Sequence, residues 1–486
     1  MPQVEDIVNV GFSLHQEGKL EEAENAYHEA LRLDNKNAEV YNLIGVLKLQ
    51  QGEVDEAVEY VERAVEISAQ SYFYETLFQA YIRQQSYEKI IKNSSFVLEL
   101  FKDNFTLLFN VALAYKNLHQ NKEAIKFYEK ALNVNPTSYQ AWFNLANVYS
   151  IEAETENALS AMQVCKKLRP KDGETRYFLS LALMRVKNYD KGLKYFENRV
   201  SKEVASAVLK KTYPNKFRED NEWKGENIKN KTILVYYEAG FGDVIMFSRY
   251  LPIVKDRCKK LILMVQKPLS PSIMENLHLG VDEIIDTFIP ESNIDFDCHC
   301  ALLSLPYVLK LKNDEVFAYA NGYLKADDKK TEEYRKKYFD NDKIKVGIKW
   351  QGNTYFDKDR VIPAEMFKPL MSIKNTQYYS FQTFEGSENI TTLDGIIDIG
   401  KDLIDFSQTA AALKNLDLVI CNDTSLAHLA GAMRIPCWIL LPYDVNWRWH
   451  TDLSVCDWYE SVRLFRQKSI GDWQSVFDEV LNEMKP

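Results

Sequence analysis

The sequence has no apolar run near the roughly 18 residues that a membrane-spanning helix needs. Its first residues, Met1 to Asp6, do not have the pattern of a signal peptide. Positive charge is also in short supply, because 60 lysines and arginines stand against 70 aspartates and glutamates and leave a net charge of -10. Nucleic-acid binding needs clustered cations that neutralise phosphates. We therefore expect a cytoplasmic protein with no membrane span and no nucleic-acid partner.

Cysteine is scarce as well. The seven cysteines are odd in number and lie mostly in apolar stretches, which indicates reduced core residues and not a disulfide framework. One tight cluster of metal-ligating types is present, Cys298-His299-Cys300. Alternate residues of a strand point to opposite faces, however, and the sequence has no second ligand pair after it. The sequence predicts no metal site and no bound cofactor.

The first two hundred residues contain a repeat. A set of small and aromatic residues recurs 34 positions later, which is typical of helix-turn-helix repeats. The first set is Gly11, Ala23, Tyr27 and Ala30, the second is Gly45, Ala57, Val61 and Ala64, and further copies place Ala124 with Ala158 and Pro136 with Pro170. The pattern resembles the tetratricopeptide repeat. About six repeats over residues 1–200 predict an all-α solenoid.

Such an array usually holds a peptide or a partner protein in its groove. Nothing in the repeats indicates chemistry. The other possibility that the sequence leaves open is that the repeats only stabilise or dimerise the C-terminal region.

Residues 201–231 break the repeat and are interpreted as a linker that packs on the next domain. From Thr232 onward, short apolar runs alternate with helical segments, which is typical of a doubly wound α/β region. Two Rossmann-like halves are predicted, 232–340 and 341–486. The amphipathic tail, 471–484, is expected to form a helix that crosses back to the first half.

The first predicted strand ends in a glycine-containing turn, Glu238 to Asp243. Gly240 and Gly242 are expected to let the backbone turn tightly and to leave room for a ligand. Asp243 then stands at the start of a helix. It serves either as a helix cap or as a general base that faces a cleft.

A second turn of this kind comes after the apolar run 416–421. Asp423, Thr424 and Ser425 are good N-cap types, and Ser425 and His428 lie three residues apart on one face of a helix. The backbone N–H groups at such a helix start are suited to a phosphate. The alternative for the same residues is an ordinary helix cap with a core histidine.

These motifs carry a family resemblance. The matching segments are Glu238 to Asp243, Arg249 to Pro252, Asp423 to Gly431, Pro442 with Trp447-Arg448-Trp449, and Arg463 to Gln467. Together they look like the bacterial tetratricopeptide-repeat proteins with a glycosyltransferase family 9-like domain, which is related to the ADP-heptose:lipopolysaccharide heptosyltransferases and has the GT-B fold. The layout is also similar to that of protein O-GlcNAc transferase.

The resemblance implies an inverting glycosyltransferase that needs no metal. Asp243 would be the general base, on the acceptor side formed by residues 232–340. Residues 341–486 would form the nucleotide-sugar side. There Thr424 and Ser425 would hold the departing diphosphate, and Asp423 and His428 would contact phosphate or sugar. Further candidates are Lys349 and Arg360, for added positive charge, and Trp447-Arg448-Trp449, which either line the nucleotide or pack as aromatic core.

The leading hypothesis is therefore a glycosyltransferase that modifies a hydroxyl of a protein recruited by the repeats, with the nucleotide-sugar as co-substrate. One alternative keeps the enzyme but gives it a glycan or lipid-linked acceptor. The other is a catalytically inactive scaffold that retains the transferase fold.

Overall fold

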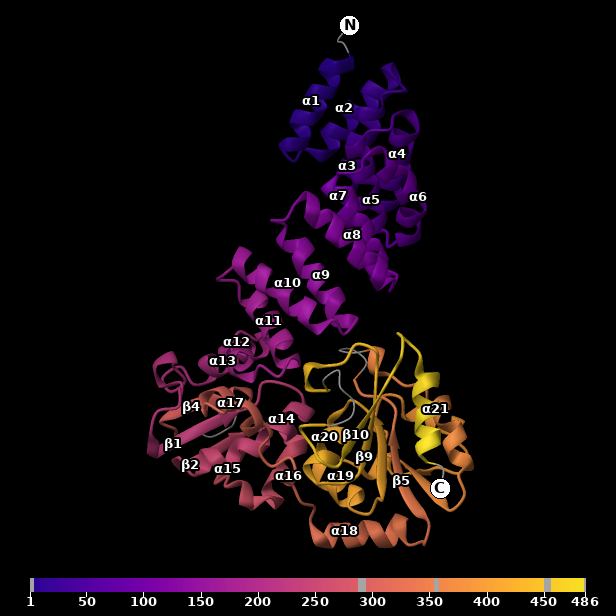
Figure 1. The fold of residues 1–486 in the computed structure, drawn as a ribbon. Coiled ribbons are helices and arrows are strands. Elements are labelled where there is room, and N and C mark those ends of the chain that lie inside the picture. Colours follow the sequence, from indigo (N-terminus) through magenta and orange to yellow (C-terminus); the bar gives the residue numbers. More distant parts are fainter. Residues whose placement is uncertain (1–3, 287–293, 354–357, 450–455, 485–486) are drawn as a thin grey trace. The chain divides into compact units, whose positions relative to one another are not determined.

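The computed structural model describes residues 4–286, 294–353, 358–449 and 456–484 (Figure 1). The chain divides into two compact units, Met1–Pro170 and Lys171–Pro486. The first unit is built of helices, and the second combines helices with two parallel sheets. The predicted order, a helical repeat array followed by an α/β region, is confirmed.

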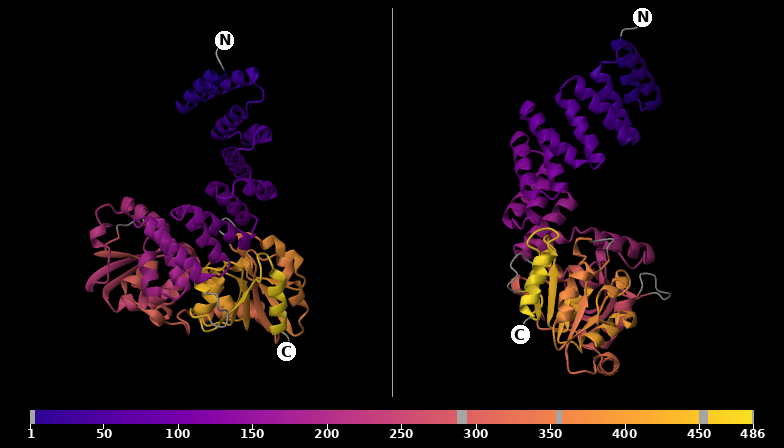
Figure 2. Two further views of the ribbon diagram at one scale, coloured as in Figure 1. Left: turned by 45° about the horizontal axis from the view of Figure 1, so that its top comes forward. Right: turned by 90° about the vertical axis from the view of Figure 1, so that its right-hand side faces the viewer.

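Helices α1 to α10 form the first unit and run back and forth one after another (Figure 2). Each odd-numbered helix packs on the next helix, as the 34-residue repeat predicts. The helices are α1 (Val4–Gln16), α2 (Leu20–Leu33), α3 (Ala38–Gln51), α4 (Val54–Ile67), α5 (Ser71–Arg83), α6 (Tyr87–Leu100), α7 (Phe105–Asn117), α8 (Asn121–Val134), α9 (Tyr139–Ile151) and α10 (Thr155–Leu168).

The repeated small residues lie where paired helices touch. Ala23 and Ala30 of α2 are fully buried. A Cβ atom added at Gly11 would lie 2.7 Å from Cε1 of Tyr27, so α1 and α2 approach each other at a distance that only glycine allows. These contacts explain why the small residues recur at a fixed period.

The second unit begins with α11 (Gly173–Arg185), α12 (Tyr189–Phe196) and α13 (Val200–Thr212). The first two pair as the sixth predicted repeat, so this repeat belongs to the same compact unit as the sheets. The stretch interpreted as a linker, 201–231, needs correction, because most of α13 and the start of the first strand lie in it. Ala205 and Leu209 of α13 are buried in one cluster with Leu234 and Ile262, so this helix covers a sheet face.

The first sheet is parallel, with the strand order β3-β2-β1-β4. Residues Ile233 to Tyr236 of its central strand are fully buried, as expected where both faces of a parallel sheet are covered. The elements are β1 (Ile228–Tyr236), α14 (Phe241–Phe247), α15 (Leu251–Lys255), β2 (Cys258–Met264), α16 (Ser270–Glu275), β3 (Glu283–Ile285), β4 (Cys298–Ala301) and α17 (Leu305–Val308).

The second sheet is also parallel, with the strand order β10-β9-β8-β5-β6-β7. Its elements are α18 (Asp328–Tyr334), β5 (Ile344–Lys349), β6 (Thr376–Ser380), β7 (Ile397–Asp398), α19 (Phe406–Leu413), β8 (Leu418–Asn422), α20 (Ser425–Ala432), β9 (Cys437–Leu441), β10 (Val462–Arg466) and α21 (Trp473–Glu483). Tail helix α21 packs on this sheet, with Phe477 against Phe367, so the expectation that it crosses back to the first half is wrong.

Among the helices that the structure describes, none is long and apolar enough to span a membrane. The described part of the chain also holds no group of three or more histidine, cysteine, aspartate and glutamate side chains that is arranged to bind a metal ion. His299, of the Cys298-His299-Cys300 cluster, is instead stacked on Phe217 with ring centroids 3.7 Å apart.

Candidate functional site

The two turns singled out in the sequence meet in the structure. Helices α14 and α20, which start at these turns, pack on each other. A Cβ atom added at Gly242 would lie 2.7 Å from Cδ2 of His428 and 3.6 Å from Cα of Ser425. Two motifs nearly two hundred residues apart therefore form one site.

The glycines of the first turn serve only in part the purpose expected of them. Gly240 has a φ of -67°, which any residue adopts, and an added Cβ there would find its nearest neighbour, an oxygen of Asp243, at 3.7 Å. Gly242 is not among the residues with positive φ. Neither glycine therefore has a backbone conformation that requires glycine, but both line the cavity at this site, as expected for residues that leave room for a ligand. Gly242 also allows the close approach of α14 to α20.

A cavity of about 690 Å³ lies at this meeting point. Its walls come from segments at or after the carboxyl ends of β1, β2, β5, β6, β8 and β9, which is where parallel sheets bind ligands. The lining residues are Gly240, Phe241, Gly242, Asp243, Gln266, Lys349, Gln351, Gly352, Asn353, Arg360, Thr383, Phe384, Glu385, Asn422, Asp423, Thr424, Ser425, His428 and Arg448. The predicted residues of the two turns, together with Lys349 and Arg360, all line this one cavity, whereas Trp447 and Trp449 do not.

Lys349 is the most unusual charge in the cavity wall. It is 8% exposed, and its Nζ donates a hydrogen bond to the carbonyl oxygen of Phe381 at 3.3 Å. Among the residues that the structure describes, no carboxylate forms an ion pair with it. Burial lowers the pKa of Lys349 to about 8. A buried ammonium group without an anionic partner is unfavourable, so the site is suited to an anionic ligand.

The second predicted cation, Arg360, has an anionic partner. Its Nη1 lies 3.1 Å from Oδ2 of Asp423, and its backbone carbonyl accepts a hydrogen bond from Nδ2 of Asn422 at 2.9 Å. Asp423 is 7% exposed, so its carboxylate is largely committed to this ion pair. These contacts hold the turn after β8 against the segment that carries Arg360.

Helix α20 begins without a side-chain cap. Thr424 occupies the N-cap position, but its hydroxyl donates to the carbonyl oxygen of Asn422 at 3.4 Å and makes no capping bond to the helix. The N–H groups in the first turn of a helix have no partner within the helix, and the helix dipole makes them attractive to anions. The residues expected as cap types therefore leave this end of the helix available to a ligand.

His428 lies in the wall between the two turns. Its Nδ1 shares a hydrogen bond of 2.9 Å with the hydroxyl of Tyr459, and its ring stacks on Trp449 with centroids 5.3 Å apart. Burial lowers the pKa of His428 to about 4, so the imidazole is neutral at pH 7. Both histidine interpretations hold in part, because the ring is packed in the core while it also lines the cavity.

Asp243 is held by a residue that the sequence left undecided. The Nη2 of Arg448 forms an ion pair with Oδ1 of Asp243. Trp447 and Trp449 are buried, as aromatic core packing predicts, whereas Arg448 between them lines the cavity. The sequence could suggest this arginine as a ligand contact, but it could not show that its partner is the candidate base.

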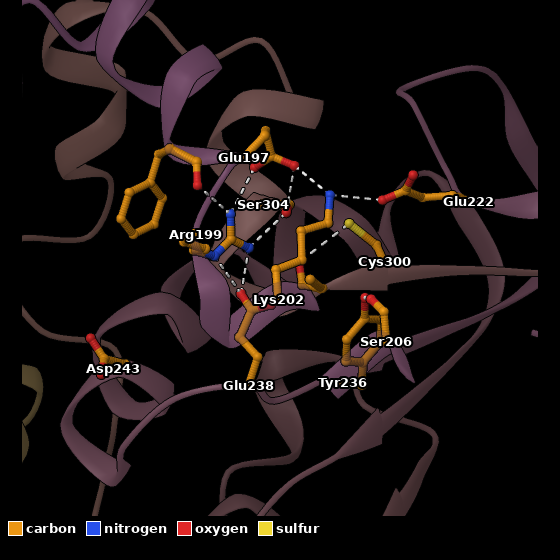
Figure 3. A network of polar contacts seen from close by, with 12 residues as sticks. Glu197, Arg199, Lys202, Ser206, Glu222, Tyr236, Glu238, Asp243, Cys300 and Ser304 are labelled. Atoms are coloured by element: carbon orange, nitrogen blue, oxygen red, sulfur yellow. Dashed lines mark hydrogen bonds and ion pairs between the residues drawn. The ribbon is translucent and has the colours of Figure 1, made fainter. Parts of the chain in front are cut away.

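A buried charge network holds the strand end just before Asp243 (Figure 3). Glu238, the second residue after β1, has no exposed side-chain area and accepts hydrogen bonds from Nε and Nη2 of Arg199. Arg199 also donates to Oγ of Ser304 at 2.8 Å and to Glu197 at 3.0 Å. Burial raises the pKa of Glu238, although Arg199 opposes this. The link between α12 and α13 is thus tied to the turn that carries the candidate base.

A second residue outside the sequence motifs orders the turn after β5. Gln382, which is 2% exposed, accepts hydrogen bonds through Oε1 from the N–H groups of Trp350 and Gln351, at 3.3 and 3.1 Å. Its Nε2 donates to the carbonyl of Glu385 at 2.7 Å. One buried amide therefore joins the turn after β5 to the loop after β6. The sequence marked it only as the end of a strand.

Comparison with known proteins identifies the first part of the chain. Residues 14–215 match the family model described as "Tetratricopeptide repeat". Protein FlbA of Caulobacter vibrioides is 23% identical over 406 residues, which cover 76% of this chain and 65% of FlbA. The anaphase-promoting complex subunit CDC16 of Saccharomyces cerevisiae is 30% identical over 115 residues, which cover 23% of this chain and 14% of that protein. The chain spans less than two thirds of the length of either relative.

Solved structures of repeat proteins also match. YrrB, described as a tetratricopeptide-repeat protein with an unusual peptide-binding site, is 19% identical, with a TM-score of 0.32 over 35% of this chain and 88% of that chain. PilF of Pseudomonas aeruginosa is 16% identical, with a TM-score of 0.36 over 44% of this chain and 93% of that chain. The match to FlbA extends over more of the chain than the repeats occupy, so it includes part of the α/β region.

Proposed function

We propose that this chain, whose N-terminal part is a tetratricopeptide-repeat array, is a glycosyltransferase that moves a sugar from a nucleotide-sugar to a protein hydroxyl. The observation that carries the proposal is the buried ammonium of Lys349, which lacks a carboxylate partner among the described residues and lines the same cavity as Asp243. Two parallel sheets with a shared cavity at their carboxyl ends support the GT-B arrangement that the sequence resemblance implies.

The donor fits the side of the cavity formed by the second sheet. Its diphosphate would lie at the start of α20, against the N–H groups that come after Thr424, with the Lys349 ammonium on the other side. Negative charge grows on the diphosphate as the sugar leaves. Fixed dipoles and a buried cation stabilise that charge without any reorganisation of solvent, so the proposed reaction needs no metal.

The acceptor fits the side of the first sheet, where Asp243 stands in the first turn of α14. In the proposed step, the Asp243 carboxylate takes the proton of the acceptor hydroxyl, and the oxygen attacks the anomeric carbon of the sugar. The bond from that carbon to the diphosphate breaks, and its electron pair leaves with the diphosphate. A direct displacement of this kind inverts the configuration of the sugar.

The repeats make a protein the favoured acceptor, because stacked repeats form extended surfaces that bind other proteins. The YrrB structure, whose description names a peptide-binding site, shares only this general fold with the chain. A glycan or lipid-linked acceptor remains the alternative within the same reaction class. Transfer to protein in a lysate treated with a labelled nucleotide-sugar, followed by digestion with protease, distinguishes the two acceptors.

A second candidate function is a scaffold without activity, and the ion pair between Asp243 and Arg448 favours it. The guanidinium occupies one of the two carboxylate oxygens that would receive the proton of an acceptor hydroxyl. In this case the cavity would be a remnant and the repeats would carry the function alone.

Nucleotide binding and sugar transfer separate these candidates. We expect one of UDP, GDP, ADP or CMP to raise the melting temperature of the full chain, because a ligand that binds only the folded state stabilises it. Lys349→Met should remove the shift, whereas Asp243→Asn should keep nucleotide binding and abolish transfer. A chain that binds none of the four nucleotides at millimolar concentration supports the scaffold.

A further inference from the structure

Arg448 contacts both sides of the candidate reaction. It lies in the short 3-10 turn Trp447–Trp449 of the second half, and its guanidinium reaches Asp243 of the first half. Its other contacts within the described part of the chain are with uncharged groups. Nη1 donates to Oδ1 of Asn446 at 2.8 Å, Nε donates to Sδ of Met246 at 3.3 Å, and the guanidinium lies over the Trp447 ring at 4.7 Å.

The ion pair conflicts with the proposed role of Asp243. The Arg448 guanidinium donates to Oδ1 of Asp243, so it occupies the position that an acceptor hydroxyl would need in order to give its proton to that oxygen. The paired arrangement is therefore not one in which Asp243 acts as a base. For the reaction to proceed, Arg448 has to move away from Asp243.

The charges around the cavity indicate what removes Arg448. Among the described residues, the cations that line the cavity are Lys349, Arg360 and Arg448, and each arginine forms an ion pair with an aspartate. A nucleoside diphosphate brings at least two negative charges, which is more than Lys349 alone neutralises. One of the arginines is thus drawn toward the diphosphate.

The two ion pairs differ in the carboxylate that remains when the arginine moves, and this difference favours Arg448 although its own side chain is 12% exposed and that of Arg360 is 31% exposed. Arg360 is paired with Asp423, whose side chain is 7% exposed, whereas Asp243 keeps 23% of its side-chain surface exposed and is solvated if the arginine leaves. The planar fork of a guanidinium also binds two phosphate oxygens at once, which makes a diphosphate a good competitor for a single carboxylate.

We propose that Arg448 is a donor-operated latch on the general base. Before the donor binds, it neutralises Asp243. When the donor binds, it moves to the diphosphate, and Asp243 is released for the acceptor. The donor then binds before the acceptor, and the base stays inactive until a sugar is in place. This inference rests on the proposed glycosyltransferase function and assigns a role to a residue that the sequence motifs left open.

The test is a double-mutant cycle on nucleotide affinity in the full chain. Titration calorimetry with UDP, GDP, ADP and CMP first identifies the nucleotide that the wild type binds. Arg448→Gln should then weaken it by about tenfold or more, because a charge-assisted bond to phosphate is lost. Asp243→Asn should tighten it several-fold, because Arg448 no longer has to leave an ion pair before it binds the phosphates.

The cycle also separates the latch from simple repulsion. If Asp243 only repels the phosphates, Asp243→Asn tightens binding equally with Arg448 or Gln at position 448. If the latch operates, the gain disappears in the Arg448→Gln background. Arg434→Gln is the matched control, because Arg434 pairs with Glu460 outside the cavity. The nucleotide affinity of this variant should equal that of the wild type.

The outcomes distinguish failure of the latch from failure of the proposed function. Binding of none of the nucleotides by the wild type overturns the donor site itself. Binding that is insensitive to Arg448→Gln, or a gain from Asp243→Asn that persists without Arg448, overturns the latch and leaves the donor site in place. Inorganic pyrophosphate should repeat the same pattern, because the proposed contact is to the diphosphate.

Discussion

Gly242 and His428 lie so close that the first could carry no side chain without displacing the second. A Cβ atom added at Gly242 would be 2.7 Å from Cδ2 of the His428 ring, which is shorter than a normal carbon–carbon contact. The ring cannot easily retreat, because it stacks on Trp449 and is bonded to Tyr459. The spacing of the two sheets at the cavity thus depends on one glycine.

Gly242→Ala should destabilise the second unit by roughly 1–3 kcal/mol, because an added methyl group forces packed atoms apart. The same shift of α14 away from α20 should weaken nucleotide binding. Denaturation monitored by tryptophan fluorescence measures the first effect, since seven of the eight tryptophans lie after residue 171. Gly240→Ala is the matched control, because the nearest atom to its Cβ is at 3.7 Å, and it should unfold like the wild type. Equal losses in both variants would show that the turn, and not the contact, needs glycine.

His428 should make the second unit sensitive to mild acid. Burial lowers its pKa from 6.5 to about 4, and Asp423 opposes this only in part. Between pH 6.5 and 4 the unfolded chain therefore binds a proton that the folded chain does not bind, so stability falls as the pH falls through this window. The loss from this group is up to about 3 kcal/mol.

The comparison that isolates this group is His428→Gln. The variant should lose less stability than the wild type between pH 6.5 and 4, because glutamine does not titrate. Urea denaturation at several pH values measures the difference. Parallel losses in the two proteins would mean that His428 is protonated in the folded state at an ordinary pKa.

Local signals explain how much of this architecture could be predicted. A strand, a polar glycine-containing turn and a helix are recognisable within about 20 residues, and both such turns were predicted with their site residues. The 34-residue period gave the repeats for the same reason. Because parallel strands end at one edge of a sheet, residues placed just after several strands were expected to converge, and they line one cavity.

The sequence could not show which residues that are far apart in the chain contact each other in the fold. Arg448 and Asp243 are 205 residues apart, and no local pattern pairs them. The same holds for Tyr459 beside His428 and for the buried amide of Gln382. For α13 a signal was present, because Ala205 and Leu209 are four residues apart on one helix face, but charged neighbours favoured the linker interpretation.

Removal of Arg199 alone should strongly destabilise the second unit, because its buried partner Glu238 would remain. Both side chains are almost fully buried, so Arg199→Met leaves an unpaired carboxylate in the interior and should cost about 3–5 kcal/mol. Arg199→Met with Glu238→Leu should recover most of this loss, because no buried charge remains. The exposed pair of Arg63 and Glu66 is the control, and Arg63→Ala should leave stability nearly unchanged because both side chains stay in water. A double variant as unstable as the single one would show that the arginine stem, not its charge, is needed.

We expect Lys349 to destabilise the protein when no ligand is bound and to contribute to the binding of an anion. Its pKa is lowered to about 8 by burial, so near pH 7 the folded chain holds a charged ammonium that water would solvate better. Lys349→Met is therefore expected to raise the free energy of unfolding at pH 7, by up to about 3 kcal/mol, while it removes nucleotide binding.

The pH dependence gives Lys349→Met an independent check. From pH 8 to 10.5 the unfolded lysine keeps a proton that the folded lysine has lost, so wild-type stability should rise relative to the variant as the pH rises through this window. Urea denaturation of both proteins at pH 7, 9 and 10.5 measures the closing gap. A less stable variant at pH 7 would mean that the ammonium already has a favourable partner, and the main support for an anionic ligand would be lost. A more stable variant that no longer binds nucleotide would mean that this charge is retained for the ligand and not for the fold.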